Sequence, residues 1–290
     1  MGIILAILLF SAIIIIHELG HFLLAKANGI RVDEFSLGLG PTLFGKQFGE
    51  TKFSVKLLPF GGACMMGEDD VEDISEGSFN SKSVWARMSV IVAGPLFNLI
   101  LAWILCMIMI AWVGYRTPVV GGVIDGYSAQ EQGLSEGDVI TKIGGRSVHI
   151  WNDISLYNLT HSEEKEVEIT YKRDGKTHTA VLEPRQKEGD TAPLLGVTGG
   201  KMERPGFFGT LKYGAYTVKY WIDYTVDSLR MLVTGRVGMK DLSGPVGIVS
   251  AVDGVYQEAA PAGLSVIILN LMNIGILITA NLGVMNLLPL

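Results

Sequence analysis

The sequence has little charge and no excess of basic residues. Only 18% of its 290 residues are charged and 49% are hydrophobic, a composition too apolar for an ordinary soluble domain. The net charge of −6, without a basic stripe interleaved with aromatics, argues against a nucleic-acid partner. The chain has two cysteines, Cys64 and Cys106, in unrelated contexts, so we expect them to pack rather than to form a disulfide framework. Composition therefore predicts a membrane protein.

Residues 1–25 are expected to form the first transmembrane helix. From Ile3 onward they are nearly all apolar, and the run is long enough to cross a bilayer. Its only ionisable side chains are His17, Glu18 and His21. Ionisable groups in hydrocarbon are costly and are usually functional, so these three residues require an explanation.

The spacing of these residues predicts a metal site. Histidines four residues apart lie on one helical face, so His17 and His21 can bind one Zn²⁺, and Glu18 can take a proton from a water on the metal. This is the HExxH pattern. Three alternatives are a satisfied structural contact, a cleaved secretory signal and a peripheral zincin on an anchor. The absence of a basic leader argues against the second, and the apolar flanks of HELGH argue against the third.

Residues 30–67 are expected to form a membrane-associated β segment. Glycines punctuate it, and Phe53, Val55 and Leu57 alternate with Ser54 and Lys56 as in a half-buried strand. A free edge of such a sheet can pair with an extended substrate beside the metal. A soluble hairpin packed on another element is the alternative.

Residues 84–113 are expected to form the second transmembrane helix, interrupted by Gly94-Pro95 and by Asn98. Asn98 either bonds a neighbouring helix or positions substrate or the oxyanion at the metal. Lysines and arginines lie between the two spans but not before the first, so the intervening segment is expected to be cytoplasmic. The region after Val113 is then extracytoplasmic.

Residues 117–186 have the composition of a water-soluble α+β domain. We expect a helix near Asn152–Leu159 and turns at Gly144-Gly145 and Asp174-Gly175, with four strands. The strands are predicted at Val119–Ile124, Asp138–Ile143, Glu166–Tyr171 and His178–Leu182. The run Gly133-Leu-Ser-Glu-Gly-Asp-Val-Ile140 resembles that of bacterial protease PDZ domains, which bind extended chains by strand addition. A spacer without a ligand is the alternative.

The remaining segments complete a multi-pass α-helical membrane protein. Residues 189–206 are predicted to be a linker and Asp241–Ile248 a structured turn. Residues 207–233 are predicted to be an interfacial amphipathic helix or, alternatively, a soluble helix packed on the preceding domain. Residues 262–290 are expected to be an incomplete third transmembrane helix. Its asparagines can join helices or line a water-accessible site.

Together these motifs resemble the site-2 protease family of intramembrane zinc metalloproteases, in its bacterial PDZ-containing branch. The resemblance is carried by HELGH at 17–21, Gly-Pro-x-x-Asn at 94–98, Leu-Ser-Gly-Pro at 242–245 and Asn-Leu-Gly-Val-Met-Asn-Leu-Leu-Pro-Leu at 281–290. It implies that His17 and His21 bind zinc, that Glu18 is the general base, and that Asn98, Asn281 and Pro289 contact substrate.

The family's third ligand, an aspartate in a Leu-Asp-Gly run, does not occur before Leu290. Asp33 or Glu34 can replace it only if the fold brings them near. We therefore expect a C-terminally truncated chain, whose reading frame continues to an Asp-Gly pair and a further span, and which by itself is inactive. Catalytic zinc sites usually have three protein ligands and one open position.

The resemblance implies regulated intramembrane proteolysis in the cell's inner membrane. The expected substrate is a single-span protein, such as an anti-sigma factor, already trimmed by another protease and filtered by the PDZ-like domain. The competing hypothesis is a non-catalytic membrane scaffold or receptor that binds peptides through that domain. Substitution of Glu18 by Gln separates the two, because only the enzyme requires the carboxylate.

Overall fold

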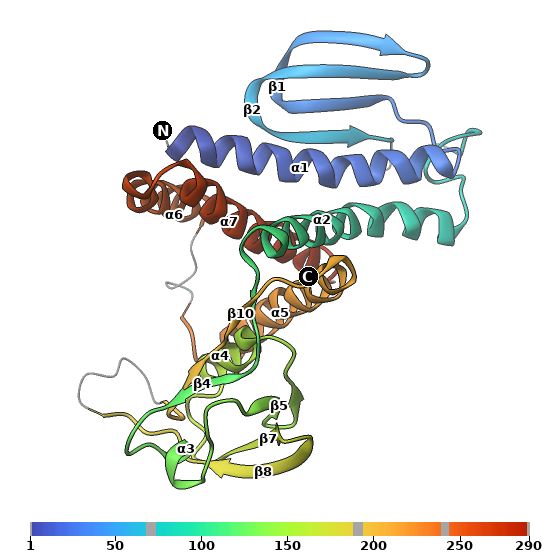
Figure 1. Ribbon diagram of the computed structural model, residues 1–290. Helices are drawn as coiled ribbons and strands as arrows, with labels where there is room; N and C mark the ends of the chain where they lie inside the picture. The colour runs from blue at the N-terminus through green and yellow to red at the C-terminus, as the bar shows by residue number, and fades with distance from the viewer. Residues whose placement is uncertain (1, 68–73, 188–193, 239–243, 289–290) are drawn as a thin grey trace. The chain divides into compact units, whose positions relative to one another are not determined.

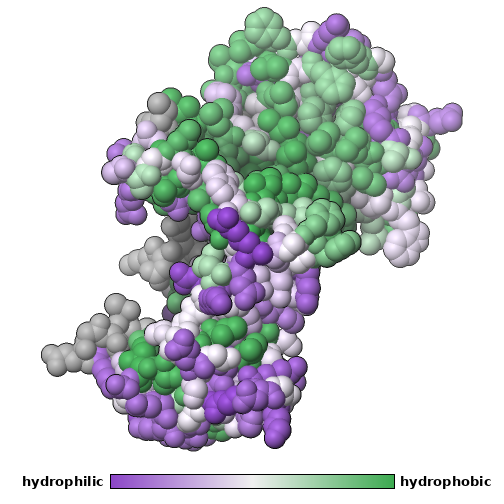
Figure 2. Space-filling model, in the orientation of Figure 1, coloured by the Kyte–Doolittle hydropathy of each residue, from purple (hydrophilic) through white to green (hydrophobic). Residues whose placement is uncertain are grey.

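The computed structural model describes residues 2–67, 74–187, 194–238 and 244–288, and the chain divides into two compact units (Figure 1). The membrane unit comprises Met1–Leu105 and Gly238–Leu290. The inserted unit comprises Cys106–Val237. On the face drawn in Figure 2, apolar residues cover much of the first unit, whereas polar residues dominate the second.

Three helices are long and apolar enough to cross a membrane: α1 (Gly2–Ala27), α2 (Val84–Val113) and α7 (Leu264–Met285). A helix suits these stretches because it satisfies every interior backbone group within the segment, where lipid offers no hydrogen bonds. They overlap the ranges 1–25, 84–113 and 262–290, in which spans are predicted, and their crossing of the bilayer stays a prediction. The length and composition of these three helices make the chain a membrane protein, and an α+β unit is inserted in it.

Small residues allow these helices to pack closely. A Cβ on Gly20 of α1 would lie closer than 3.0 Å to the carbonyl oxygen of Ala93 in α2. One on Gly283 of α7 would meet Leu99 and, at 3.1 Å, the carbonyl oxygen of Pro95 in α2. Because lipid is as apolar as the helices, such close backbone approach is a main source of association between them.

Strands β1 (Glu34–Phe48) and β2 (Thr51–Met65) form a bent two-stranded sheet beside α1 (Figure 1). Phe35 is paired with Phe53 on one side and with Cys64 on the other, so each strand contributes two arms. The last arm of β2, Gly61–Met65, pairs with residues 34–37 of β1. Beneath it, a buried cluster joins the sheet to α1 and α2 through Ala25, Ile30, Val32, Phe35, Cys64, Met66, Phe79 and Val90.

The region predicted to be a turn at Asp241–Ile248 is largely helical where the structure describes it. Helix α6 (Pro245–Ala259) begins directly after Gly244, and a 3₁₀ turn, η2 (Ala260–Ala262), follows it. Pro245 at the first helical position explains the difference, because proline's fixed φ suits a helix start as well as a turn. Residues 239–243 lie outside the described residues, so Leu242 and Ser243 of the Leu-Ser-Gly-Pro motif do as well.

The inserted unit is built around a four-stranded antiparallel sheet of order β6-β5-β7-β8. Its strands are β5 (Val139–Ile143), β6 (Arg146–Ser147), β7 (Val167–Arg173) and β8 (Lys176–Leu182). The same unit also contains two helices, α3 (Ser128–Glu131) and α4 (Trp151–Thr160). Helix α4 lies where the sequence predicts a helix, near Asn152–Leu159. The centre of the core is formed by Ile140, Ile143, Ile154, Ile169 and Leu182.

The predicted linker at 189–206 is wrong in its described part, because that part contains two short strands. β9 (Val197–Gly199) pairs with β4 (Val120–Val123), and β10 (Met202–Glu203) pairs with β3 (Tyr115–Arg116). These pairings join residues about 75 or more positions apart, whereas the glycine content that suggested a linker is a local signal. The inserted unit thus extends beyond residue 186.

Helix α5 (Phe207–Val233) packs on α4, as the soluble-helix alternative requires. Tyr213 stacks on Tyr115 with ring centroids 3.8 Å apart, and Tyr216 stacks on His149 at 3.9 Å. Burial and the hydroxyl of Tyr213 raise the pKa of Tyr115 well above its ordinary value. The interfacial placement of this helix stays a prediction.

Candidate metal centre

His17 and His21 converge on one point beside α1. Their Nε2 atoms are 3.2 Å apart. The other ring nitrogen of each histidine has a partner on α2. The Nδ1 atom of His21 lies 2.7 Å from the carbonyl oxygen of Val90, and the Nδ1 atom of His17 lies 3.1 Å from the side-chain amide nitrogen of Asn98. A tetrahedral ion with bonds of about 2.0–2.1 Å separates two nitrogen ligands by about 3.3–3.4 Å. The observed separation therefore fits two ligands of one metal ion.

Gly94 keeps the space in front of the two imidazoles open. A Cβ built on this residue would lie closer than 3.0 Å to the Nε2 atoms of both His17 and His21. Any other residue at this place in α2 would project a side chain into the point where the two nitrogens converge. The space between Gly94 and the two Nε2 atoms, here called the cradle, therefore requires glycine and leaves room for a metal ion.

Glu18 connects the metal centre to the sheet. Its Oε2 atom accepts a hydrogen bond of 3.0 Å from the backbone N–H of Cys64, in the last arm of β2. Gly62 of the same arm approaches α1 so closely that a Cβ there would lie 3.5 Å from the Cγ atom of Glu18. The predicted general base therefore lies between the histidines and the last arm of β2.

A cavity of about 280 Å³ adjoins this carboxylate. It is lined by Glu18, His21, Cys64, Met66, Phe79, Val90 and Ile91. Most of these side chains are apolar, and the two that are not belong to the HExxH sequence. An extended peptide entering this cavity meets the predicted base and one of the predicted metal ligands.

Asn98 is fully buried and lies next to His17, not in the lining of this cavity. Its backbone carbonyl accepts a hydrogen bond of 3.1 Å from the Thr279 hydroxyl, which ties α2 to α7. Asn281 is exposed on α7, and Pro289 lies outside the described residues. Their roles in substrate binding stay predictions.

Asp33 and Glu34 do not replace the third metal ligand. Asp33 pairs with Arg31, and Glu34 accepts a hydrogen bond from Ser54 and lies within 4 Å of the amino groups of Lys52 and Lys56. Among the described residues, no three His, Cys, Asp or Glu side chains are grouped closely enough to hold a metal. Within the described part of the chain, His17 and His21 stay the predicted ligands.

A glutamate fixed beside two converging histidines on one helix, the HExxH arrangement, defines a metalloprotease. The chain belongs to peptidase family M50, which it matches over residues 5–290. The protein is accordingly a zinc metalloprotease, and zinc is its cofactor.

Two relatives align over all or nearly all of the chain, and a solved structure is similar to a part of it. A protein of Clostridium acetobutylicum, provisionally named a zinc metalloprotease, is 38% identical over 289 residues, which cover 100% of this chain and 83% of the relative. The regulator of sigma-W protease RasP of Bacillus subtilis is 29% identical over 370 aligned positions, covering 98% of this chain and 85% of the relative. The PDZ domain of an SdrC-like protein from Listeria monocytogenes is 26% identical, with a TM-score of 0.25, over 29% of this chain and 88% of that domain.

Sequence reasoning missed three contributors to the site: Gly94, the Cys64 amide and Thr279. Gly94 was visible as part of the Gly-Pro motif, but its distance to the histidines depends on how α1 and α2 pack. The Cys64 amide leaves no signal in the sequence, because any residue except proline has a backbone N–H. Thr279 lies among many polar residues of α7 that look alike in the sequence.

Proposed function

We propose that this metalloprotease cleaves single-span membrane proteins within or close to the bilayer, by regulated intramembrane proteolysis. One observation carries the proposal: the HExxH residues lie inside α1, a helix of 26 residues whose other side chains are almost all apolar up to Lys26. A protease acting on soluble chains has no need to place three ionisable groups at that depth, where their cost is high.

Glu18 has the position that a general base requires. It can accept a proton from the attacking water and donate it to the leaving nitrogen of the peptide bond. Zinc, when bound, supplies the Lewis acid that activates the water and polarises the peptide carbonyl. His17 and His21 hold the metal, and the Cys64 amide fixes the Glu18 carboxylate beside the last arm of β2.

The last arm of β2 is suited to present the substrate. A transmembrane helix resists hydrolysis because its carbonyls are bonded internally, so the substrate has to unwind. Gly61–Met65 lies next to Glu18, which accepts a hydrogen bond from the Cys64 amide, and an extended chain can bind to a strand in this place by strand addition. Strand addition there supplies the hydrogen bonds that the unwound segment loses.

The sheet itself is suited to contact lipid or an apolar substrate. Large hydrophobic side chains are exposed on both strands, and they include Leu37, Leu39, Leu43, Phe44, Phe48, Val55, Leu57 and Leu58. An exposed apolar surface of this size is unusual for a sheet that faces water. We infer that β1 and β2 are associated with the membrane.

The inserted unit is proposed to be an extracytoplasmic PDZ-like domain that binds peptides and filters substrates. The Gly133–Ile140 run supports the PDZ assignment, and the distribution of lysine and arginine between the first two spans supports the orientation and a location in the cell's inner membrane. A substrate of the anti-sigma-factor class, trimmed beforehand by another protease, fits the name of the Bacillus subtilis relative, which refers to regulation of sigma-W.

The test is Glu18→Gln in the protein expressed from its full natural reading frame and reconstituted with a single-span substrate. We expect cleavage to fall by about 10²–10⁴-fold while zinc stays bound, because the metal ligands are unchanged. Glu166→Gln, an exposed position in the inserted unit, is the matched control and should cleave normally. Undiminished cleavage by Glu18→Gln would refute the assignment of the base.

A further inference from the structure

A histidine that binds a metal through Nε2 carries its proton on Nδ1, and an acceptor at Nδ1 fixes both the tautomer and the orientation of the ring. His21 has such an acceptor in the carbonyl oxygen of Val90, at 2.7 Å. His17 has the side-chain amide of Asn98 at its Nδ1 atom, at 3.1 Å. The two ligands are therefore oriented from behind by the same helix, α2, through different chemical groups.

Only one orientation of the Asn98 amide agrees with metal binding by His17. The atom facing Nδ1 has to accept a hydrogen bond, so it has to be Oδ1 and not the amide nitrogen. In the structure Nδ2 faces His17, and Oδ1 is buried and has no hydrogen-bond partner among the described residues. Turning the amide by half a turn therefore breaks no bond that Oδ1 makes, and it converts the contact into an Nδ1–H···O hydrogen bond.

We propose that Asn98 is a positioning residue for the zinc ligand His17, with its side-chain oxygen holding the imidazole in the metal-binding tautomer. The geometry around Asn98 suits this role better than direct contact with substrate. The residue is 0% exposed, and it does not line the cavity beside Glu18. The inference rests on the zinc site itself and holds whatever substrate the enzyme cleaves.

The position of Asn98 is fixed by two helices. It follows Gly94 by one helical turn on α2, and Thr279 of α7 donates to its backbone carbonyl. The other ligand, His21, keeps its own acceptor in the carbonyl oxygen of Val90. Loss of the Asn98 side chain should therefore loosen the ligand rather than abolish metal binding, within the range of about 10–100-fold that is typical for such outer residues.

The experiment compares zinc affinity in three variants of the solubilised protein, expressed from its full natural reading frame. Asn98→Leu keeps the size but removes the acceptor, Asn98→Asp keeps an acceptor, and Asn273→Leu makes the same change at an exposed site on α7. Chelator competition gives the zinc dissociation constant, and the absorption spectrum of the cobalt-loaded protein reports the geometry of the ligands.

We expect Asn98→Leu to bind zinc about 10–100-fold more weakly, with an altered cobalt spectrum, whereas Asn98→Asp stays within a few-fold of the wild type and Asn273→Leu is unchanged. If Asn98→Leu does not fold, as judged by its helical content, Asn98→Ala is assessed by the same two readouts. Wild-type affinity and spectrum in a folded variant lacking the acceptor would overturn the proposal. Equal loss in Asn98→Asp and Asn98→Leu would do so too. A raised KM with unchanged zinc affinity would instead assign Asn98 to substrate binding.

Discussion

Gly94 determines whether the two histidines can share an ion, because it leaves their common point free of side-chain atoms. Replacing Gly94 by Ala should force the imidazoles apart or occupy the place of the metal, since the new Cβ would lie closer than 3.0 Å to both Nε2 atoms. We expect zinc affinity to fall by at least about tenfold. The zinc content of the protein after dialysis measures this loss of affinity.

The matched control for Gly94→Ala is Gly254→Ala in α6, where a Cβ would meet no atom within 4 Å. This control should retain its zinc, because alanine is a better helix former than glycine and the site is distant in sequence from the ligands. A Gly94→Ala protein that binds zinc as tightly as this control would show that the cradle does not hold the ion.

Asp138 gives the inserted unit a pH dependence. Burial raises the pKa of this carboxyl, but hydrogen bonds from Arg173 and from the Ser135 amide lower it by more, so the net pKa lies below its usual value. A carboxyl whose pKa is depressed by folding stabilises the fold above its unfolded pKa, and this contribution is lost as the pH falls through the folded pKa.

The stability advantage of the wild type over Asp138→Asn should therefore shrink as the pH falls from about 6 to about 3, through the range in which aspartate titrates. Hydrogen exchange at the amides of β5 and β7 measures this advantage at each pH. A difference that does not change with pH would mean that the Asp138 charge contributes nothing to the fold.

At the residue scale, the sequence predicts ligands better than it predicts their partners. The spacing of His17 and His21 determines their common face, because helical geometry is local. The partners at Nδ1, Val90 and Asn98, come from another helix and depend on packing. Asn98 was recognised as polar in a span, but its place beside His17 rather than in the cavity required the structure.

At the element scale, the last arm of β2 has the clearest functional consequence, because its Cys64 amide bonds Glu18. Cys64→Pro removes this backbone N–H, whereas Cys64→Ala preserves it. We expect Cys64→Pro to lower kcat/KM on a reconstituted substrate by at least about tenfold, equivalent to about 1.4 kcal/mol, and Cys64→Ala to cleave nearly normally. Equal effects of the two substitutions would assign the role to the thiol instead of the strand.

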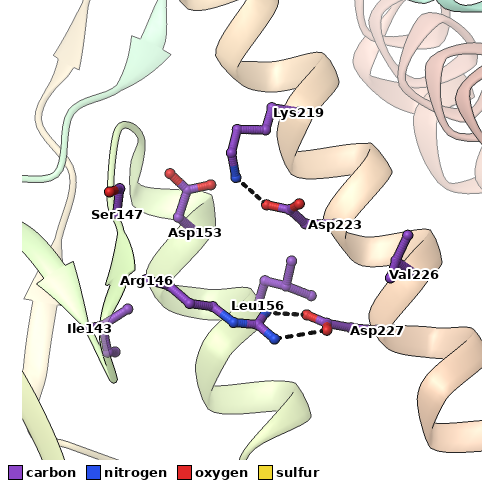
Figure 3. A pocket seen from close by; sticks show the side chains of 9 residues that line it. All are labelled: Ile143, Arg146, Ser147, Asp153, Leu156, Lys219, Asp223, Val226 and Asp227. Carbon is purple, nitrogen blue, oxygen red and sulfur yellow. Dashed lines mark hydrogen bonds and ion pairs between the residues drawn. The ribbon is translucent and has the colours of Figure 1, made fainter.

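A second testable element is the place where α5 faces β6 and α4, which contains two charged pairs (Figure 3). Arg146 donates two hydrogen bonds to Asp227, of 2.5 and 3.0 Å, and Lys219 pairs with Asp223 one turn away. The hydrogen bonds that Arg146 donates to Asp227 raise the pKa of Arg146. Asp227 is 6% exposed, so its carboxylate depends on this partner.

Arg146→Met should destabilise the packing of α5 more than the double variant Arg146→Met/Asp227→Leu, because only the single variant leaves a buried charge without its partner. Since the Arg146 side chain is 39% exposed, we expect the single change to cost about 1–2 kcal/mol, below the range for fully buried pairs. Protection of α5 amides against hydrogen exchange tests the order. Greater loss in the double variant would contradict it.

Elements were predictable where their signal is local. The three apolar helices, α4 and the strands of the inserted sheet follow from hydrophobic runs and alternation, and they lie within a few residues of the predicted ranges. β9 and β10 are short, and they exist only through pairing with β4 and β3 far away in sequence. α6 was mistaken for a turn because its start, Gly244-Pro245, is compatible with both.

At the scale of the whole molecule, the chain combines an apolar membrane unit that contains the metal centre with a polar inserted unit. Composition predicted this division, because charged residues are rare in the spans and frequent between residues 117 and 233. The contacts of a partner chain cannot be deduced from composition or from periodicity, because neither encodes them.

The position of the cleaved bond tests the central claim most directly. A single-span substrate is reconstituted in lipid vesicles with the protein expressed from its full natural reading frame, and its fragments are identified by mass spectrometry. The account predicts a cut inside the apolar span or at its membrane boundary, which disappears in Glu18→Gln. Cleavage confined to the soluble flanks of the substrate, or cleavage that persists in Glu18→Gln, would contradict it.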